Sequence, residues 1–343
     1  MVYKELISVW IFLVVGLCAF SVHAQSIQTQ DRQQVPIQDA DAPLDLVHFV
    51  QPVGQDSLVI ADGTGRLALF VDGMYATDLG EQGQGPCEHQ SILTTGRYAS
   101  LLFGLDRGQQ RLLAYDSESG ACLDQIQSSD LRRATGLAST ESHLFLARGQ
   151  YTSQTEPDTP LFFRVEREQE AEDEPVEGAV VVETSFTLAD LDPVPFPVPL
   201  SVRTPVETHG ASVYFALPLS PKIVRYDRET ERFSSFEIDL TLPTADEIAS
   251  LAPEDLLPLV ERDIEFVEHL HVTDDHVVVA SRRGTGADGV WRVQVYNHNG
   301  TKQAAQTVEH QIVHLTGAHI VQLLTEETED AVYTVSKVPY TLP

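Results

Sequence analysis

The sequence predicts an all-β fold: a six-bladed β-propeller of four-stranded antiparallel blades, with a short helical insert between blades four and five. An apolar run opens six times along the chain, and three of the five steps between these runs are 43 residues long. Most copies continue through a polar turn into a second run that ends in a large apolar residue followed by Asp or Asn, as in Tyr115-Asp116. Repeats of about 40 to 45 residues with four short strands are typical of propeller blades, whereas helical repeats would show a 3.6-residue period. The six runs open at Leu58, Leu101, Leu144, Val213, Val277 and Ile320.

The first 24 residues are predicted to be a signal peptide rather than part of the fold. Lys4 supplies a positive charge, residues 7–20 are almost all apolar, and Val22-His23-Ala24 has the small-x-small pattern of a cleavage site. Cys18 raises the alternative of a lipid anchor, but Leu17 stands before it, where lipid-attachment signals carry a small residue. We therefore expect a periplasmic or secreted protein.

The segment after the signal peptide, residues 25–43, is predicted to be a linker or a closing strand, and residues 44–343 the propeller. The last blade begins so near the C terminus that little chain remains for its fourth strand. We expect the segment around Val35 to Gln38 to supply that strand, because an uncovered sheet edge invites aggregation.

The charge of the chain limits its partners. Asp and Glu number 51 and Lys and Arg 22, which gives a formal net charge of −29. Nucleic acid and anionic membranes need a basic surface, so neither is an expected partner. The excess of carboxylates and the presence of only four lysines favour adaptation to a saline (halophilic) habitat. An ordinary acidic secreted protein is the alternative.

The segment that closes the first blade carries a family resemblance. Residues 80–89 read GEQGQGPCEH, which resembles the Gly-x-x-Gly-x-Gly-Pro-Gly-x-Phe run of NHL-type six-bladed propellers. Cys87 stands where that family has Gly, and His89 where it has Phe. Six-bladed relatives include calcium-dependent lactonases, whose acidic residues surround the central channel. The matching positions are Gly80, Gly83, Gly85 and Pro86.

Three segments depart from the 43-residue period. Residues 166–178 are dense in Glu and Asp, which predicts a solvated loop, and residues 190–199 are rich in proline, which predicts an extended connector. Residues 244–262 are helical in pattern: Thr244 and Glu247 have the spacing of a capping box, and two prolines divide the segment into two short helices. Because these features occur once, we expect partner binding to use this half of the disc.

Histidines recur in the last two blades and suggest a metal site as one interpretation. The sequence from His271 to His276 is echoed 43 residues later, from His314 to His319. A feature repeated in successive blades points to the building of a hairpin, so no metal ligand is predicted. If a metal were bound, His269 and His271 would be the first candidates, because residues i and i+2 share a strand face.

No catalytic motif is identifiable: the sequence has no nucleophile elbow, P-loop, His-Glu-x-x-His or EF-hand loop. Glu207 and Glu268 lie on predicted inner strands and are candidates for a channel site. The favoured interpretation is that they are ordinary exposed carboxylates.

Two cysteines remain after cleavage, Cys87 and Cys122. An even pair in an exported protein indicates a possible disulfide.

The favoured function is therefore an exported, monomeric propeller that binds a protein, peptide or glycan, without a cofactor and without insertion into a membrane. The alternative is a calcium-dependent, lactonase-like hydrolase that uses the central channel.

Overall fold

The computed structural model describes two short N-terminal segments, 28–29 and 33–36, and most of residues 47–341. The predicted signal peptide lies outside the described residues. The gaps after residue 47 are 54–56, 63, 73, 99–100, 129–130, 132, 141–142, 150–154, 168–178, 192–202, 218, 245–246, 248–257, 260–262, 285–288, 309–310, 316–318 and 326–332.

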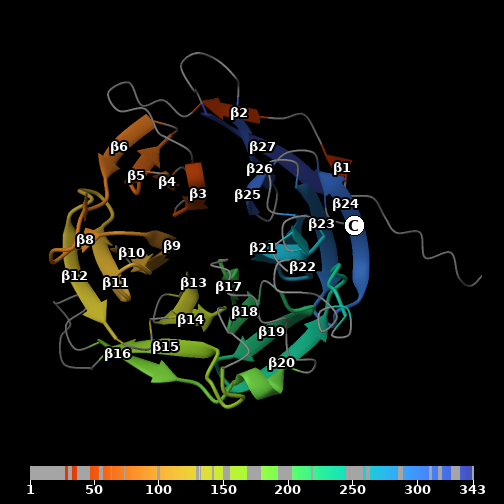
Figure 1. Ribbon diagram of the computed structural model, residues 1–343. Coiled ribbons are helices and arrows are strands. Elements are labelled where there is room, and N and C mark those ends of the chain that lie inside the picture. Colours follow the sequence, from red (N-terminus) through yellow and green to blue (C-terminus); the bar gives the residue numbers. More distant parts are fainter. Residues whose placement is uncertain are drawn as a thin grey trace, which may run out of the picture.

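Antiparallel sheets arranged like spokes around a central axis make up most of the described chain, which is a β-propeller (Figure 1). A short parallel pair, β7 (Glu81–Gln82) and β8 (Glu88–His89), lies between the first and second of these sheets in the sequence. Five sheets within the described residues each hold four consecutive strands. The first holds β3 (Val47–Pro52), β4 (Ser57–Asp62), β5 (Leu67–Val71) and β6 (Met74–Asp78); the second holds β9 (Ile92–Tyr98), β10 (Leu101–Asp106), β11 (Arg111–Asp116) and β12 (Cys122–Gln127). The third holds β13 (Ala134–Ser139), β14 (Leu144–Arg148), β15 (Phe162–Arg167) and β16 (Ala179–Glu183); the fourth holds β17 (Val206–His209), β18 (Ser212–Ala216), β19 (Lys222–Asp227) and β20 (Arg232–Glu237). The fifth holds β21 (Glu265–Val272), β22 (His276–Arg283), β23 (Val290–Asn297) and β24 (Lys302–Val308).

The last sheet combines three consecutive strands with two short strands from the N-terminal segments. Its own strands are β25 (Ile312–Leu315), β26 (His319–Thr325) and β27 (Tyr333–Thr341), and β27 pairs on its outer side with β1 (Gln28–Thr29) and β2 (Gln33–Pro36). In the β2 register, Val35 lies opposite Val335. The described part of the segment that was expected to cover this edge, around Val35 to Gln38, does pair with β27, and residues 37 and 38 lie outside the described residues. The prediction of six blades of four consecutive strands holds for only five sheets of the described chain.

The ring closes through its innermost strands. Contacts link β3 to β9, β9 to β13, β13 to β17, β17 to β21 and β21 to β25, and β25 in turn contacts β3. Apolar side chains fill the space between neighbouring sheets, as where the rings of Phe162 and Phe215 stack with centroids 5.0 Å apart. The core therefore lies between the sheets.

Repeated Asp and Asn residues build the turn between the third and fourth strands. Asp116 accepts a hydrogen bond from the backbone N–H of Ser119 at 2.7 Å, and Asp227 accepts one from Thr230 at 2.9 Å. Asn297 does the same with Thr301 at 2.8 Å. Such side chains satisfy the backbone of a tight turn locally, which is why they recur at this point of the repeat.

The predicted helical insert is not among the described elements. In the described part of the chain the only helix that forms an element is the short 3-10 helix η2 (Leu188–Asp190), and most of residues 244–262 lies outside that part. Thr244 and Glu247 do form the predicted capping box, with the Thr244 N–H 2.7 Å from the Glu247 carboxylate. The hydrogen bonds of a helix N-terminus are thus present at Thr244, but the structure describes no helix of the expected length after it. No described helix is long and apolar enough to cross a membrane.

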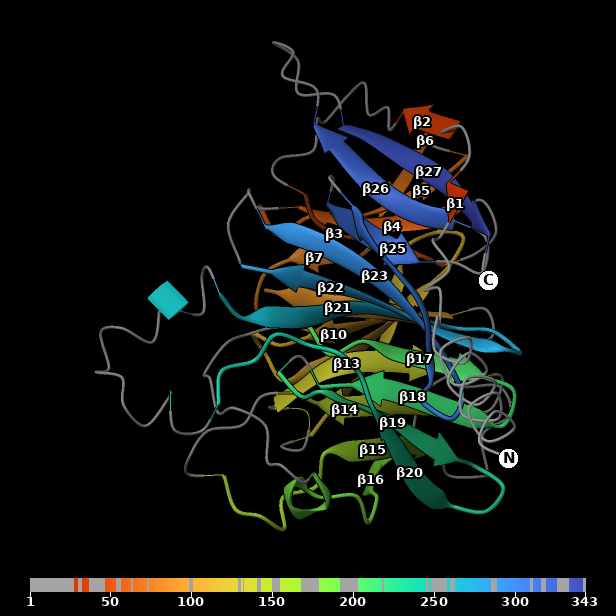
Figure 2. The ribbon, with the colours of Figure 1, turned by 90° about the vertical axis from the view of Figure 1, so that its right-hand side faces the viewer.

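The two faces of the disc carry different connections. In a four-stranded antiparallel sheet, the outer strand ends at the edge where the inner strand begins, and we call this side the crossover face (on the left in Figure 2). The insert follows β20 and the proline-rich segment follows β16, so both leave the sheets at the crossover face. The acidic segment joins β15 to β16 and leaves from the opposite face. The described strand ends that flank the acidic segment therefore lie on the opposite face from those at which the other two segments begin.

Candidate functional site

The space at the axis of the ring of inner strands, which we call the channel, brings together the four polar candidates of the sequence. Glu207 lies on β17, and Glu268, His269 and His271 lie on the neighbouring inner strand β21. The Nδ1 atom of His271 is 3.2 Å from the Glu207 carboxylate, so the two strands meet through these side chains. The carboxylates are not the exposed groups that the sequence favoured: the Glu207 side chain is 28% exposed and that of Glu268 is 16% exposed.

Arg203, which precedes β17, bridges the channel. Its guanidinium donates a hydrogen bond to the side-chain oxygen of Gln51 on β3 and lies 6.0 Å from the ring centroid of Phe49. β3 and β17 are not neighbours in the ring of inner strands, so this side chain spans the axis. Burial lowers the pKa of Arg203 to about 10, although the nearby charges of Glu268 and Glu207 act against the shift.

Neutral histidines lie beside this arginine. His269 donates from Nε2 to the backbone oxygen of Ile312 on β25 at 2.8 Å, and burial lowers its pKa to about 3, with further lowering by Arg203. Burial also places the pKa of His314 well below its ordinary value, and His269 adds to this effect. Both rings are therefore uncharged at neutral pH.

Glu268 is held by Arg282 of β22, whose guanidinium lies 2.8 Å from the carboxylate. Burial nevertheless raises the pKa of Glu268, and the pairing with Arg282 offsets only part of that increase. The channel thus contains two arginines and two glutamates whose charges compensate one another.

The arrangement is poor in free metal ligands. Among the residues that the structure describes, no three His, Cys, Asp or Glu side chains are grouped so that they could hold a metal ion. His269 and His271 share a face of β21, since Leu270 and Val272 pack toward the fourth sheet. They nevertheless hold different partners, one on β25 and one on β17.

The other repeated histidines belong to hairpins, as the repetition indicated. His276 donates its backbone N–H to the Thr273 hydroxyl at 3.0 Å, and His143 does the same with Thr140 at 3.1 Å. The corresponding turn of the last sheet, residues 316–318, lies outside the described residues. In these two sheets, Thr-x-x-His therefore forms the turn between the first and second strands.

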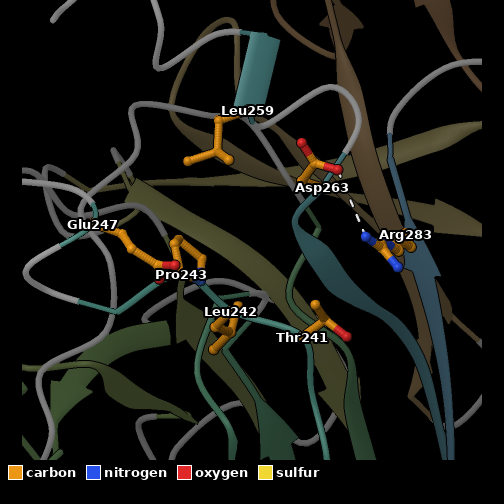
Figure 3. Close-up of a pocket in the computed structure, with 7 residues that line it drawn as sticks. All are labelled: Thr241, Leu242, Pro243, Glu247, Leu259, Asp263 and Arg283. Carbon is orange, nitrogen blue, oxygen red and sulfur yellow. Dashed lines mark ion pairs between the residues drawn. The ribbon is translucent and has the colours of Figure 1, made fainter. Parts of the chain in front are cut away.

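A cavity of about 400 Å³ opens on the crossover face, between the segment that follows β20 and the end of β22 (Figure 3). Leu242, Pro243 and Leu259 form its apolar middle. Glu247 lies at one side, and Asp263 and Arg283 lie together at the other. The lining residues are Thr241, Leu242, Pro243, Glu247, Leu259, Asp263 and Arg283.

A buried carboxylate fixes one wall of this pocket. Glu265, which is 3% exposed, accepts hydrogen bonds from the backbone N–H of Thr241 at 2.9 Å and from the Arg292 guanidinium at 2.7 Å. It also accepts one from the Ser281 hydroxyl. Because a satisfied buried network of this kind is costly to break, the wall at Thr241 is rigid.

The ion pair at the pocket rim is weak by comparison. Arg283 and Asp263 are 3.6 Å apart, and each side chain is 51% exposed. Exposed pairs of this kind contribute about 0–1 kcal/mol, so the two groups are available to exchange partners.

Cys87 and Cys122 are joined in a disulfide, with Cα atoms 5.7 Å apart. The bond ties the segment after the first sheet to the outer strand of the second. Cys87 has φ +62°, a left-handed conformation that favours glycine, which is the residue at this position in the NHL-type run. Cys87 therefore has a backbone conformation that glycine adopts more readily.

No known family profile and no curated protein matches the chain. Many solved structures are similar to it, and two of them are described here. A member of the DUF4221 family from Bacteroides vulgatus ATCC 8482 has a TM-score of 0.63 at 9% identity, over 93% of this chain and 99% of that one. A protein described as exported, from Bacteroides fragilis NCTC 9343, has a TM-score of 0.59 at 12% identity, over 93% of this chain and 97% of that one.

This likeness shows the fold alone. Both solved structures are matched over nearly their whole length, so the present chain spans a comparable arrangement of sheets. The NHL-type resemblance stays a prediction, based on the residues of the first blade closure.

Proposed function

We propose that this protein is an exported binding propeller that holds a protein, peptide or glycan at the pocket on its crossover face. The observation that carries the proposal is the pocket itself. Most of its lining residues belong to the connection between the fourth and fifth sheets, which is longer than the 43-residue period predicts. Its volume lies in the range of about 300–1,000 Å³ that is usual for ligand sites. A rigid wall beside a connecting loop is also the usual setting for recognition.

The proposal includes the architecture and the location. We count the sheet of β25, β26 and β27 as a sixth blade, closed by the N-terminal strands, and retain the NHL-type resemblance for the whole disc. The predicted signal peptide and the disulfide support a periplasmic or secreted location, because disulfides persist in oxidising compartments. One of the similar solved structures, that from Bacteroides fragilis, is also described as an exported protein. We expect a monomer that needs no cofactor.

The rival function, a calcium-dependent hydrolase in the channel, is less well supported. Its acids would have to be available, but Glu268 pairs with Arg282 and Glu207 lies against His271. Arg203 also places a positive charge in the channel. Calcium prefers six to eight oxygen ligands, and these contacts work against such a set.

The test uses the mature chain, residues 25–343, on peptide and glycan arrays. A Leu242→Trp variant fills the pocket, and Leu123→Trp is the matched control, because Leu123 is 49% exposed on β12. We expect the array signal to fall at least tenfold for the first variant and to stay unchanged for the second. Equal binding by both variants would contradict the proposed site.

Calcium titration with a thermal-shift readout, together with a screen of lactones and esters, tests the rival. We expect no calcium-dependent stabilisation and no turnover. Turnover that chelation abolishes would replace the binding function with the enzymatic one.

A further inference from the structure

We propose that the pocket on the crossover face takes an apolar side chain, such as leucine or phenylalanine, from a positively charged peptide segment of a partner. The inference deepens the proposed function and rests on it, since it selects a peptide over a glycan at the same pocket. Its basis is the contrast between the middle of the pocket, which is apolar, and the polar groups around it, which already have partners (Figure 3).

The apolar middle of the pocket continues the core of the protein. Leu242 and Leu259 are half-buried, and both pack against a buried cluster of three apolar side chains. That cluster consists of Leu219, Ile264 and Phe266. An apolar side chain that enters the pocket therefore removes apolar surface from water on both partners, which is the main source of affinity in sites of this kind.

The polar groups beside Glu247 and Thr241 are engaged within the protein. The Glu247 carboxylate accepts hydrogen bonds from the backbone N–H and the hydroxyl of Thr244, at 2.7 and 2.8 Å. The backbone N–H of Thr241 donates to the Glu265 carboxylate at 2.9 Å, and the Thr241 carbonyl accepts from the N–H of Glu265 at 3.0 Å. These groups therefore need nothing from a ligand.

The opposite side of the pocket is satisfied in the same way. Asp263 and Arg283 pair with each other at 3.6 Å, and each side chain is 51% exposed. Because this pair lies at the rim, an apolar side chain in the middle leaves it in contact with water. A glycan would need hydrogen-bond partners for its hydroxyl groups when water is removed, and the engaged groups on both sides of the pocket match that need poorly.

The charge of the whole chain selects the kind of segment that carries the apolar residue. With a net charge of −29, the protein attracts positively charged segments and repels negatively charged ones, over a distance of about 10 Å at 0.1 M salt. This field acts on the segment as a whole and requires no contact between a basic residue and a carboxylate of the pocket. The ligand is therefore an apolar residue flanked by basic ones.

The experiment compares three probe peptides: Ac-Gly-Lys-Gly-Leu-Gly-Lys-Gly-NH₂, an analogue with serine in place of leucine, and an analogue with glutamate in place of both lysines. Binding to the mature chain is measured by isothermal titration at low and at 300 mM NaCl. We expect the leucine peptide to bind at least tenfold more tightly than the serine analogue at both salt concentrations, because burial of apolar surface does not depend on screening. The glutamate analogue should bind more weakly than the leucine peptide at low salt and approach it at 300 mM.

Two variants locate the effect. Leu242→Ser and Leu259→Ser each remove part of the apolar middle, and we expect each to weaken binding of the leucine peptide at least threefold without changing that of the serine analogue. Leu123→Ser, at a position 49% exposed on β12, is the matched control. A peptide with photo-leucine in place of leucine locates the site on the natural protein, so the test does not depend on the folding of the variants. We expect its crosslinks at residues 241–243 or 259.

The outcomes separate the inference from the proposed function. Equal binding of the leucine and serine peptides would overturn the inference, and a glycan signal on the arrays that Leu242→Trp removes would then leave the proposed function standing. Binding that neither serine variant alters, with crosslinks elsewhere, would overturn the inference by placing the site outside the pocket. Absence of binding by all three peptides would also overturn it, and the arrays alone would then decide the proposed function.

Two further results would overturn parts of the inference. A larger loss of binding in Asp263→Asn than in Leu259→Ser would show that an ion pair, rather than apolar burial, carries the affinity. Equal binding of the glutamate analogue and the leucine peptide at low salt would overturn the choice of a positively charged segment.

Discussion

Arg203 donates a hydrogen bond to Gln51 across the central channel, and the two residues lie 152 positions apart on inner strands or beside them. The contact joins sheets that are not neighbours in the ring. It therefore acts as a strut across the disc, whereas the contacts between the described inner strands link each sheet to the next.

Removal of this strut should destabilise the whole disc. In Arg203→Ala, Gln51 loses its partner, and Glu268 and Glu207 lose a compensating charge. We expect the free energy of unfolding to fall by about 1–3 kcal/mol, the usual range for leaving a buried polar group unpaired. Urea unfolding measures the change, and Arg232→Ala, at an exposed position on β20, is the control. Equal stability of the two variants would mean that the Arg203–Gln51 contact does not stabilise the folded protein.

Acid should destabilise the protein through the channel histidines. The pKa of His269 is about 3 in the folded chain and about 6.5 in its ordinary state. Between these values the unfolded chain takes up a proton that the folded chain refuses, so stability falls as the pH drops from 6.5 toward 3. His314 acts in the same direction. Above pH 6.5 neither group contributes to the pH dependence.

Glu268 opposes this trend, because its raised pKa lets the folded chain take up a proton first. Unfolding curves between pH 7 and pH 4 should therefore be flatter for His269→Gln than for the natural sequence, and steeper for Glu268→Gln. Arg203, Arg282 and His271 face the same space and stay unchanged in both variants. Parallel curves for all three proteins would contradict the assignment.

The disulfide should contribute substantially to stability. Cys87 and Cys122 are separated by 35 positions, and a loop of that length is expected to stabilise the folded state by about 3–4 kcal/mol through the entropy of the unfolded chain. Denaturant unfolding of Cys87→Ser/Cys122→Ser measures the loss. Thiol labelling of the denatured, unreduced natural protein gives an independent check, since two reactive thiols would show that the bond is absent.

Salt should raise the melting temperature if the acidic composition is an adaptation to saline surroundings. Screening over a few ångströms removes repulsion among the surplus carboxylates. We expect the melting temperature, measured by differential scanning calorimetry, to increase markedly between low and molar NaCl. A melting temperature that is independent of NaCl would leave the carboxylates a role in solubility only.

The sequence could predict the sheets because the residues that build them recur. Asp116, Asp227 and Asn297 each satisfy a turn within four residues of themselves, so their spacing reports local structure directly. The pairing of β27 with an N-terminal strand was also expected, because an uncovered sheet edge invites aggregation.

The channel could not be predicted to the same extent. The sequence places Glu207, Glu268, His269 and His271 on or near inner strands, but the partners of Glu207, His269 and His271 come from other sheets. Arg203 belongs to no motif, and nothing near it in the sequence indicates that it reaches Gln51. Long-range contacts between irregular positions leave no periodic signal, and the same holds for the pocket, where Arg283 of β22 meets a segment from another sheet.

The pairing of β2 with β27 has a consequence for the order in which the chain folds. Gln33 lies opposite Lys337, so this pairing joins residues about 300 positions apart. A contact of such high separation forms late, because the ends must meet against the entropy of the whole intervening chain. The early sheets can form while the chain is still being made, but the N-terminal segment stays without its partner until the last strand emerges. Truncation of the final ten residues would therefore leave an otherwise complete chain permanently unable to close.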